Sequence, residues 1–260
     1  MKEHIFICPF DKNLLDRLSN KRLVVKTSAF ENIHPILQHV NNVKSVLHCI
    51  MVEYSGSLAS VPFHESWRGI PVAIFANEMG AFKEVINKIR LIRDLSVRIF
   101  LNSDNKENFT ALHILASLGI DCGIFFGKNQ IDWEAMNDLM TYAVYGKVNH
   151  ATIEPFQYVV TNYNPARLTD FSSVYFENPR QYIHIDKDEN IDKAIHSWQE
   201  FFLKPDGCAY CQAWRVCMGK FSESVEKNPS CRQFFVDLMD AADHFLSVQQ
   251  KNKRKELWQP

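Results

Sequence analysis

The sequence of 260 residues contains no run of about 18 apolar residues, so it predicts no transmembrane helix and no membrane partner. Its first residues, MKEHIFICPFDKN, hold too short an apolar stretch for a signal peptide, and a cytoplasmic location is expected. An excess of charge of one sign is also missing. The formal net charge of −1 gives no reason to expect nucleic acid or anionic lipid as the main partner.

Several motifs of well-known enzyme classes are absent as well. There is no phosphate loop, no dinucleotide fingerprint and no G-x-S-x-G sequence. His48 precedes Cys49, but neighbouring strand residues point to opposite faces, so they make a poor catalytic pair. His184 and Asp186 share a strand face, for which surface polarity is a commoner explanation than acid–base chemistry. No catalytic residue is predicted, and we do not expect an enzyme.

The sequence contains seven cysteines. In the reducing compartment expected here, they are not predicted to form a disulfide framework. Cys8, Cys49 and Cys122 each lie in an apolar strand candidate, and we expect them to act as small buried hydrophobes. The other four fall close to the C-terminus.

The first 150 residues alternate between short apolar runs and helical stripes. Strands recur about every 25 residues with a helix between them, which is typical of βαβ units in a parallel sheet. A partial (β/α) barrel is the economical α/β fold, and an open doubly wound sheet is the alternative. Predicted strands lie at 4–8, 23–27, 45–53, 71–77, 97–102 and 120–127, with helices at 11–18, 31–40, 82–92, 106–118 and from 132 onward.

The pattern changes near residue 150, where we place a soft boundary between a barrel region, 1–150, and a small α+β region, 151–260. Strands are predicted at 156–162 and 174–176, and the alternation at 181–186 predicts a half-buried antiparallel strand. A helix at 191–202 leads to the cysteines. A long amphipathic helix carrying Phe234, Phe235, Leu238, Ala242, Phe245 and Leu246 ends the chain.

Four cysteines near the C-terminus have the spacing C-x2-C-x5-C-x13-C. They are Cys208, Cys211, Cys217 and Cys231. Four thiolates satisfy either a tetrahedral zinc ion or a [4Fe–4S] cluster. Structural zinc sites commonly use two short C-x2-4-C pairs, whereas here three cysteines form a triplet and the fourth is distant. The spacing therefore favours [4Fe–4S], with zinc as the alternative.

At these residues the sequence resembles the SPASM/twitch group of radical S-adenosylmethionine proteins, whose motif runs C-x2-C-x5-C-x3-C before a more distant cysteine. The resemblance implies that Cys208, Cys211, Cys217 and Cys231 ligate the second auxiliary cluster of that family. Phe221 replaces the cysteine of the first auxiliary cluster, which is expected to be absent. Residues 180–191 resemble the hairpin that opens the SPASM region, and residues 1–150 are similar only in topology.

One family motif is missing. Radical S-adenosylmethionine enzymes carry C-x3-C-x2-C after the first strand, and here Cys8 stands there without partners. The chain is therefore interpreted as a pseudo-radical-SAM protein. The resemblance implies a non-catalytic accessory or scaffold that binds a ribosomally made precursor peptide, an active radical-SAM maturase, or both. The alternatives are an electron-transfer partner of such an enzyme and a zinc-binding structural protein.

Overall fold

The computed structural model describes residues 4–127, 131–146, 149–188, 190–191, 208–221 and 230–257. Within them one sheet of eight strands has the order β7-β6-β5-β4-β3-β2-β1-β8, and every neighbouring pair is parallel. The strands are β1 (Ile5–Pro9), β2 (Arg22–Thr27), β3 (Val46–Ser57), β4 (Val72–Glu78), β5 (Val97–Asn102), β6 (Cys122–Phe125), β7 (Ile153–Glu154) and β8 (Tyr182–His184).

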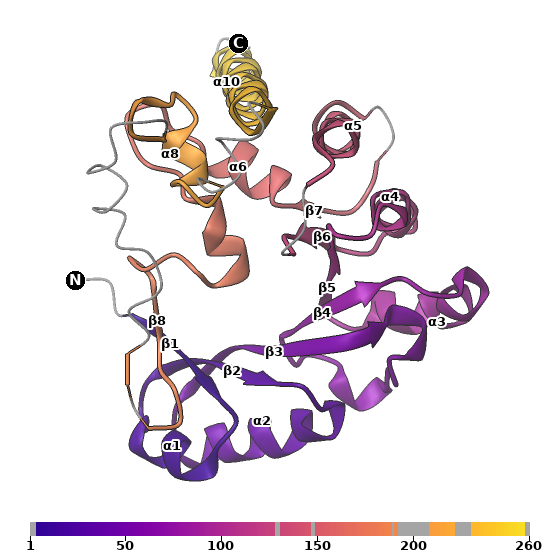
Figure 1. The fold of residues 1–260 in the computed structure, drawn as a ribbon, viewed down its shortest axis with the longest axis vertical. Coiled ribbons are helices and arrows are strands. Elements are labelled where there is room, and N and C mark those ends of the chain that lie inside the picture. Colours follow the sequence, from indigo (N-terminus) through magenta and orange to yellow (C-terminus); the bar gives the residue numbers. More distant parts are fainter. Residues whose placement is uncertain are drawn as a thin grey trace.

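The sheet curves into an arc, with helices α1 to α5 along its outer side (Figure 1). The α-helices are α1 (Lys12–Arg17), α2 (Ile33–Asn42), α3 (Phe82–Asp94), α4 (Glu107–Ser117), α5 (Trp133–Tyr145), α6 (Phe156–Asn162), α8 (Trp214–Cys217) and α10 (Ser230–Leu257). Short 3-10 helices are η1 (Phe30–Asn32), η2 (Leu58–Ser60), η3 (Glu65–Trp67), η4 (Phe171–Tyr175) and η5 (Cys208–Tyr210). This is an α/β fold consistent with a partial (β/α) barrel, as predicted.

The central strands are buried on both faces because helices cover one face and side chains fill the other. In β4, residues Val72 to Ala76 are all buried, which explains their unbroken apolar run. On the inner face Phe75 stacks on Phe100 of β5, with ring centroids 4.6 Å apart.

Helix boundaries follow the signals in the sequence. The side chain of Asp11 accepts a hydrogen bond from the Leu14 N–H, and that of Asp132 from the Ala135 N–H, so each caps the helix after it. Gly119 follows α4 with a φ of +80°, a conformation that favours glycine. The predicted ends of the helices at 106–118 and from 132 are confirmed.

The second half of the chain differs from the prediction at three places. Residues 156–162 form α6 instead of a strand, because Phe156, Val159 and Val160 make one buried helical face. Residues 174–176 lie in and directly after η4 instead of a strand. Strand β8 pairs in parallel with β1, so the predicted antiparallel strand is wrong apart from one antiparallel bridge between Ile185 and Ile191.

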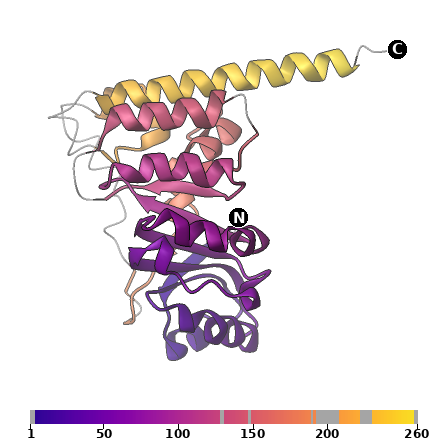
Figure 2. The same cartoon turned by 90° about the vertical axis from the view of Figure 1, so that its right-hand side faces the viewer.

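The long final helix is confirmed as α10, which lies across one end of the molecule (Figure 2). Phe234, Phe235, Leu238 and Ala242 are buried. The helix predicted at 191–202 falls outside the described residues beyond Ile191. Neither α10 nor any other helix in the described ranges is long and apolar enough to cross a membrane.

The carboxyl ends of β4 and β5 are joined by a buried amide. The Asn108 side chain, only 1% exposed, donates hydrogen bonds from Nδ2 to the carbonyl oxygens of Asn77 at 2.8 Å and Asn102 at 2.7 Å. These bonds fix the edge of the sheet that carries the cavity described below.

We predict that Asn108→Ala lowers the free energy of unfolding by about 1–3 kcal/mol, because a buried side chain is truncated and the carbonyl groups of Asn77 and Asn102 lose its two hydrogen bonds. Asn108→Asp should cost more, since a carboxylate of nearly the same shape would face two carbonyl oxygens. Chemical denaturation checks both. The control Asn41→Ala, on the exposed face of α2, should change stability by about 0.5 kcal/mol or less. Wild-type stability in both Asn108 variants would contradict this assignment.

Candidate metal centre and adjoining cavity

The segment 208–221 holds three of the four predicted ligands in a compact turn and helix. Cys208 lies in η5, and its carbonyl oxygen accepts from the Cys211 N–H at 3.1 Å. The Cys211 carbonyl oxygen then accepts from the Trp214 N–H at 3.0 Å, at the start of α8. Cys217 ends that helix. A C-x2-C turn followed by one helical turn therefore brings these three residues into one short region.

The chain reverses direction just after Cys217. Met218 and Gly219 both have positive φ, +50° and +78°, so the backbone turns back at once. Burial raises the pKa of the Cys217 thiol to about 12, the Gly219 N–H opposes this shift as a hydrogen-bond donor, and the other three thiols add to it. The Lys220 N–H donates to the Cys217 carbonyl oxygen at 3.0 Å.

The fourth predicted ligand, Cys231, comes from the first turn of α10 and is buried. Burial raises the pKa of its thiol to about 11, and Cys208 and Cys211 raise it further. Helix α10 packs against α8, so Cys231 lies near the three cysteines of the segment 208–217.

The structure thus gathers the four predicted cysteines, three of them buried and Cys211 half-buried. It does not close them into a ligand shell: within the described residues, no three His, Cys, Asp or Glu side chains are arranged to hold a metal ion. The donor set fits a four-thiolate centre in number and kind. The binding of a metal or cluster by these four cysteines remains a prediction.

Phe221 stands at the position where the predicted resemblance would require a further cysteine. Its ring contacts Phe126 at 4.8 Å, Trp133 at 5.4 Å and Phe235 at 5.6 Å between centroids. Together with Phe171 and Tyr175, these residues form an aromatic cluster between the segment 208–221, α10 and the sheet. Phe221 therefore packs the segment 208–221 against α10 and the sheet.

Two predictions about other polar residues can be compared with the structure. His48 lies at an irregularity in β3, where Val24 pairs with Cys49 and Leu23 with Leu47. The His184 ring interacts through Nε2 with the Phe176 carbonyl oxygen at 2.8 Å. The Asp186 side chain instead accepts hydrogen bonds within the turn that follows β8. The acid–base pair is not formed.

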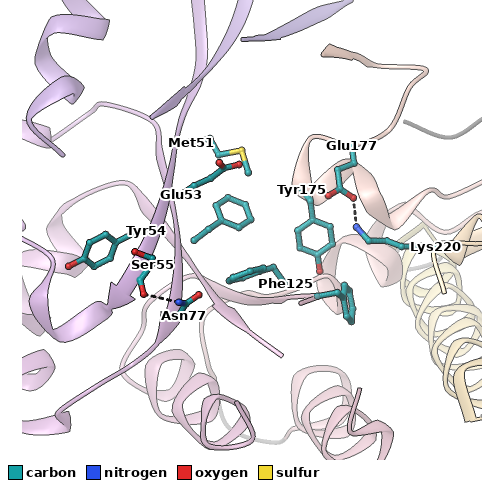
Figure 3. Close-up of a pocket in the computed structure, with 11 residues that line it drawn as sticks. Met51, Glu53, Tyr54, Ser55, Asn77, Phe125, Tyr175, Glu177 and Lys220 are labelled. Carbon is teal, nitrogen blue, oxygen red and sulfur yellow. Dashed lines mark hydrogen bonds and ion pairs between the residues drawn. The ribbon is translucent and has the colours of Figure 1, made fainter. Parts of the chain in front are cut away.

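Beside the cysteine segment lies a cavity of about 400 Å³ at the carboxyl ends of β3, β4 and β6. Met51, Glu53, Ser55 and Asn77 line it from one side, and Tyr175, Glu177 and Lys220 from the other (Figure 3). Tyr54 also belongs to the lining, but its ring points away from the cavity, toward Phe30 and Ser60. Phe75, Phe125 and Phe126 complete the lining.

Lys220 connects the cysteine segment with this cavity. Its ammonium group pairs with Glu177 and lies 4.9 Å from the centre of the Tyr175 ring. The Tyr175 hydroxyl donates to the Ile124 carbonyl oxygen at 2.6 Å, which fixes that ring. Sequence reasoning missed these residues, because Lys220 and Glu177 are 43 positions apart and no local pattern links them.

A second cavity, of about 520 Å³, adjoins the first along the same edge of the sheet. It lies at the carboxyl ends of β1 and β2, beside the turn after β8, and both cavities are lined by Glu53. Its described lining includes Lys26, Thr27, Asn32 and Asp186, but no cysteine.

Comparison of the chain with protein-family models, with curated proteins and with solved structures gives no match. The geometry of this region is therefore the basis for a functional proposal.

The three remaining cysteines are confirmed as buried residues of the sheet, since Cys8, Cys49 and Cys122 are at most 2% exposed. Burial raises the pKa of Cys8 to about 12 and that of Cys49 to about 11, from an ordinary value of 9.0. It raises the pKa of Cys122 as well. These thiols remain neutral where unfolded thiols would ionise.

This gives a prediction for stability at alkaline pH. A folded pKa above the unfolded value leaves stability intact below about pH 9 and reduces it as the pH rises toward the folded pKa. At pH 10 each thiol should cost on the order of 1 kcal/mol. Denaturant unfolding from pH 8 to pH 10 should therefore show a smaller decline in Cys8→Ala and in Cys49→Ala than in wild type. An unchanged decline in both variants would contradict neutral burial, and Ser96→Ala serves as the surface control.

Proposed function

We propose that this chain binds one auxiliary-type [4Fe–4S] cluster through Cys208, Cys211, Cys217 and Cys231 and acts as a non-catalytic accessory protein in peptide modification. It would be a pseudo-radical-SAM protein with a SPASM/twitch-like C-terminal region. The observation that carries the proposal is the return of Cys231, from a separate helix, to the three cysteines of the segment 208–217.

The surroundings of the four thiols suit a bound cluster. Trp214 and Val216 are buried beside them and exclude water, while the Gly219 N–H is directed at the Cys217 sulfur. The start of α10 favours negative charge at Cys231. When bound, the cluster supplies a four-point link between the segment 208–217 and α10, together with the capacity to accept or release an electron.

A non-catalytic role is supported by what lines the carboxyl end of β1. The resemblance implies that an active enzyme would hold its S-adenosylmethionine cluster there with three thiolates on one loop. In this chain Cys8 is buried within the strand, and Pro9 and Phe10 face the second cavity instead. The two cavities remain available for binding, which favours a scaffold for a precursor peptide or for an active maturase.

Electron transfer to an active partner enzyme is the second candidate. It is favoured by the half-buried position of Cys211 next to Tyr210, which is 86% exposed. A cluster at this place would lie near the surface, where a partner can approach. Four thiolates also satisfy zinc, so a zinc-binding structural protein is the alternative in which the same residues keep their role as ligands.

The ligand assignment is tested by single substitutions. We predict that Cys217→Ala and Cys231→Ala, purified without oxygen, lose iron, acid-labile sulfide and the broad visible absorbance of thiolate-bound iron. Wild type should hold about four irons per chain. Cys49→Ala and Cys122→Ala are matched controls, because they remove equally buried thiols. They should keep full iron content and lose about 1 kcal/mol of stability or less. Full occupancy in Cys231→Ala would refute the fourth ligand.

The non-catalytic assignment is tested with S-adenosylmethionine and a strong reductant. We predict that the pure chain forms no 5′-deoxyadenosine above background, because all four candidate thiolates are needed to cap one cluster and the other three cysteines are buried in separate strands. The cluster-free Cys217→Ala variant sets the background, and chromatography of the nucleoside products gives the measurement. Repeated turnover by the wild-type chain would overturn the pseudoenzyme assignment.

A further inference from the structure

The cavity beside Lys220 has the form of a binding site. It lies at the carboxyl ends of parallel strands, where the ligands of curved α/β sheets are usually bound. Its volume of about 400 Å³ falls within the range of about 300–1,000 Å³ common for ligand sites. Figure 3 shows its two walls facing each other across open space.

The floor of this cavity is apolar and mostly aromatic. Phe75 contacts Phe125 with ring centroids 5.5 Å apart, and Phe126 contacts Tyr175 at 6.0 Å. Met51 adds a flexible apolar side chain that can adapt its shape to a bound group. Such a floor is suited to a large flat or branched apolar group.

The charges at the rim are already compensated. Glu53 pairs with Lys26 at 2.6 Å, and Glu177 pairs with Lys220, whose ammonium also lies over the Tyr175 ring. The Asn77 amide donates to the Ser55 carbonyl oxygen at 2.7 Å. A charged group entering the cavity would meet no unpaired opposite charge in this lining. The cavity therefore favours a neutral group.

The bound molecule is expected to be extended, because the site continues into the second cavity. The two cavities share Glu53, which pairs with Lys26 of the second cavity, and we call the two cavities together the trough. The second part is lined by charged side chains, Lys26, Glu53, Asp186 and Lys187, and by the polar side chains of Thr27, Ser28, Asn32 and His184. Thr27 and Asn32 are hydrogen-bonded to each other at 2.9 Å. These groups match the hydrogen-bonding capacity of a peptide backbone with polar side chains.

We propose that this trough binds an extended peptide through one large apolar anchor residue, phenylalanine or a residue of similar size, held in the 400 Å³ cavity, with polar residues following in the second cavity. This inference rests on the proposed peptide-binding function and specifies which sequence feature the peptide must carry.

The wild-type protein is tested first with neutral single-residue probes. Protein carrying 13C-labelled methionine methyl groups is titrated with N-acetyl-phenylalanine amide, N-acetyl-alanine amide and N-acetyl-lysine amide, and the Met51 signal is assigned by its loss in Met51→Leu. The phenylalanine probe should shift the Met51 methyl signal, and the other two should not. Equal shifts with alanine, or stronger binding of lysine, would overturn the apolar anchor.

The extended character of the ligand is tested with a capped peptide of phenylalanine followed by four serines. It should bind about tenfold more tightly than the phenylalanine amide, since it also occupies the second cavity. Affinity no better than that of the amide would point to a small molecule and overturn the peptide assignment.

Two tryptophan variants locate the site. Ser55→Trp places a large side chain at the exposed rim and should weaken peptide binding by about tenfold or more. Ser96→Trp, an exposed position at the opposite end of the strands, should bind like wild type. Unaltered binding by Ser55→Trp would place the peptide elsewhere.

Metal analysis of the same samples separates this inference from the cluster assignment. Iron-containing protein that fails to bind the phenylalanine probes would overturn the anchor site alone. Protein without iron that binds them selectively would overturn the cluster assignment and support the anchor site.

Discussion

The position of the candidate site depends on the packing of Phe221 against the open side of the curved sheet. This ring joins the cysteine segment to Phe126 from the sheet side and to Phe235 of α10. The contact is apolar and requires no metal, so it can orient the segment before any metal is bound. On the N-terminal side of this contact, Lys220 lines the cavity and Cys217 lies in α8, which packs against α10. Phe221 therefore has a structural role of its own, as the apolar contact between the cysteine segment, the sheet and α10.

The cysteine site and the cavity are physically connected in this arrangement. Only Met218 and Gly219 separate Cys217 from Lys220, and both adopt the left-handed conformation that forms a tight turn. A shift of Cys217 would therefore move Lys220, which forms an ion pair with Glu177. Under the proposed function, this link would let a bound cluster hold one wall of the cavity in place.

Sequence reasoning predicted the first half of the fold well because the pattern there is unambiguous. Runs such as that of β4 are apolar throughout, helical stripes separate them, and Asp132 and Gly119 mark helix ends. The segment 156–162 was misassigned because Phe156, Val159 and Val160 suit a short strand by composition and a helix by spacing. A choice between these depends on packing against α10, which no local pattern reveals.

The candidate site was predictable only in part. Spacing identified Cys208, Cys211 and Cys217, since their local turn is encoded within ten residues. The full spacing also included Cys231 as the distant fourth cysteine, and the resemblance implied the same four ligands. In the structure Cys231 lies on α10, which packs against α8 of the cysteine segment. The cavity could not be foreseen, because Met51, Phe75, Tyr175 and Lys220 meet only when the sheet curves and the later segments cover it. The burial of Cys8, Cys49 and Cys122 was predictable, because each lies within an apolar strand.

The central claim is that four cysteines of this chain hold one iron–sulfur cluster. Native mass spectrometry of the intact protein, purified without oxygen, tests it most directly, because the mass added to the chain identifies the bound species. The account predicts one dominant form that carries about four irons and about four sulfides. A dominant form carrying a single zinc ion, or a chain with no added mass, would contradict it.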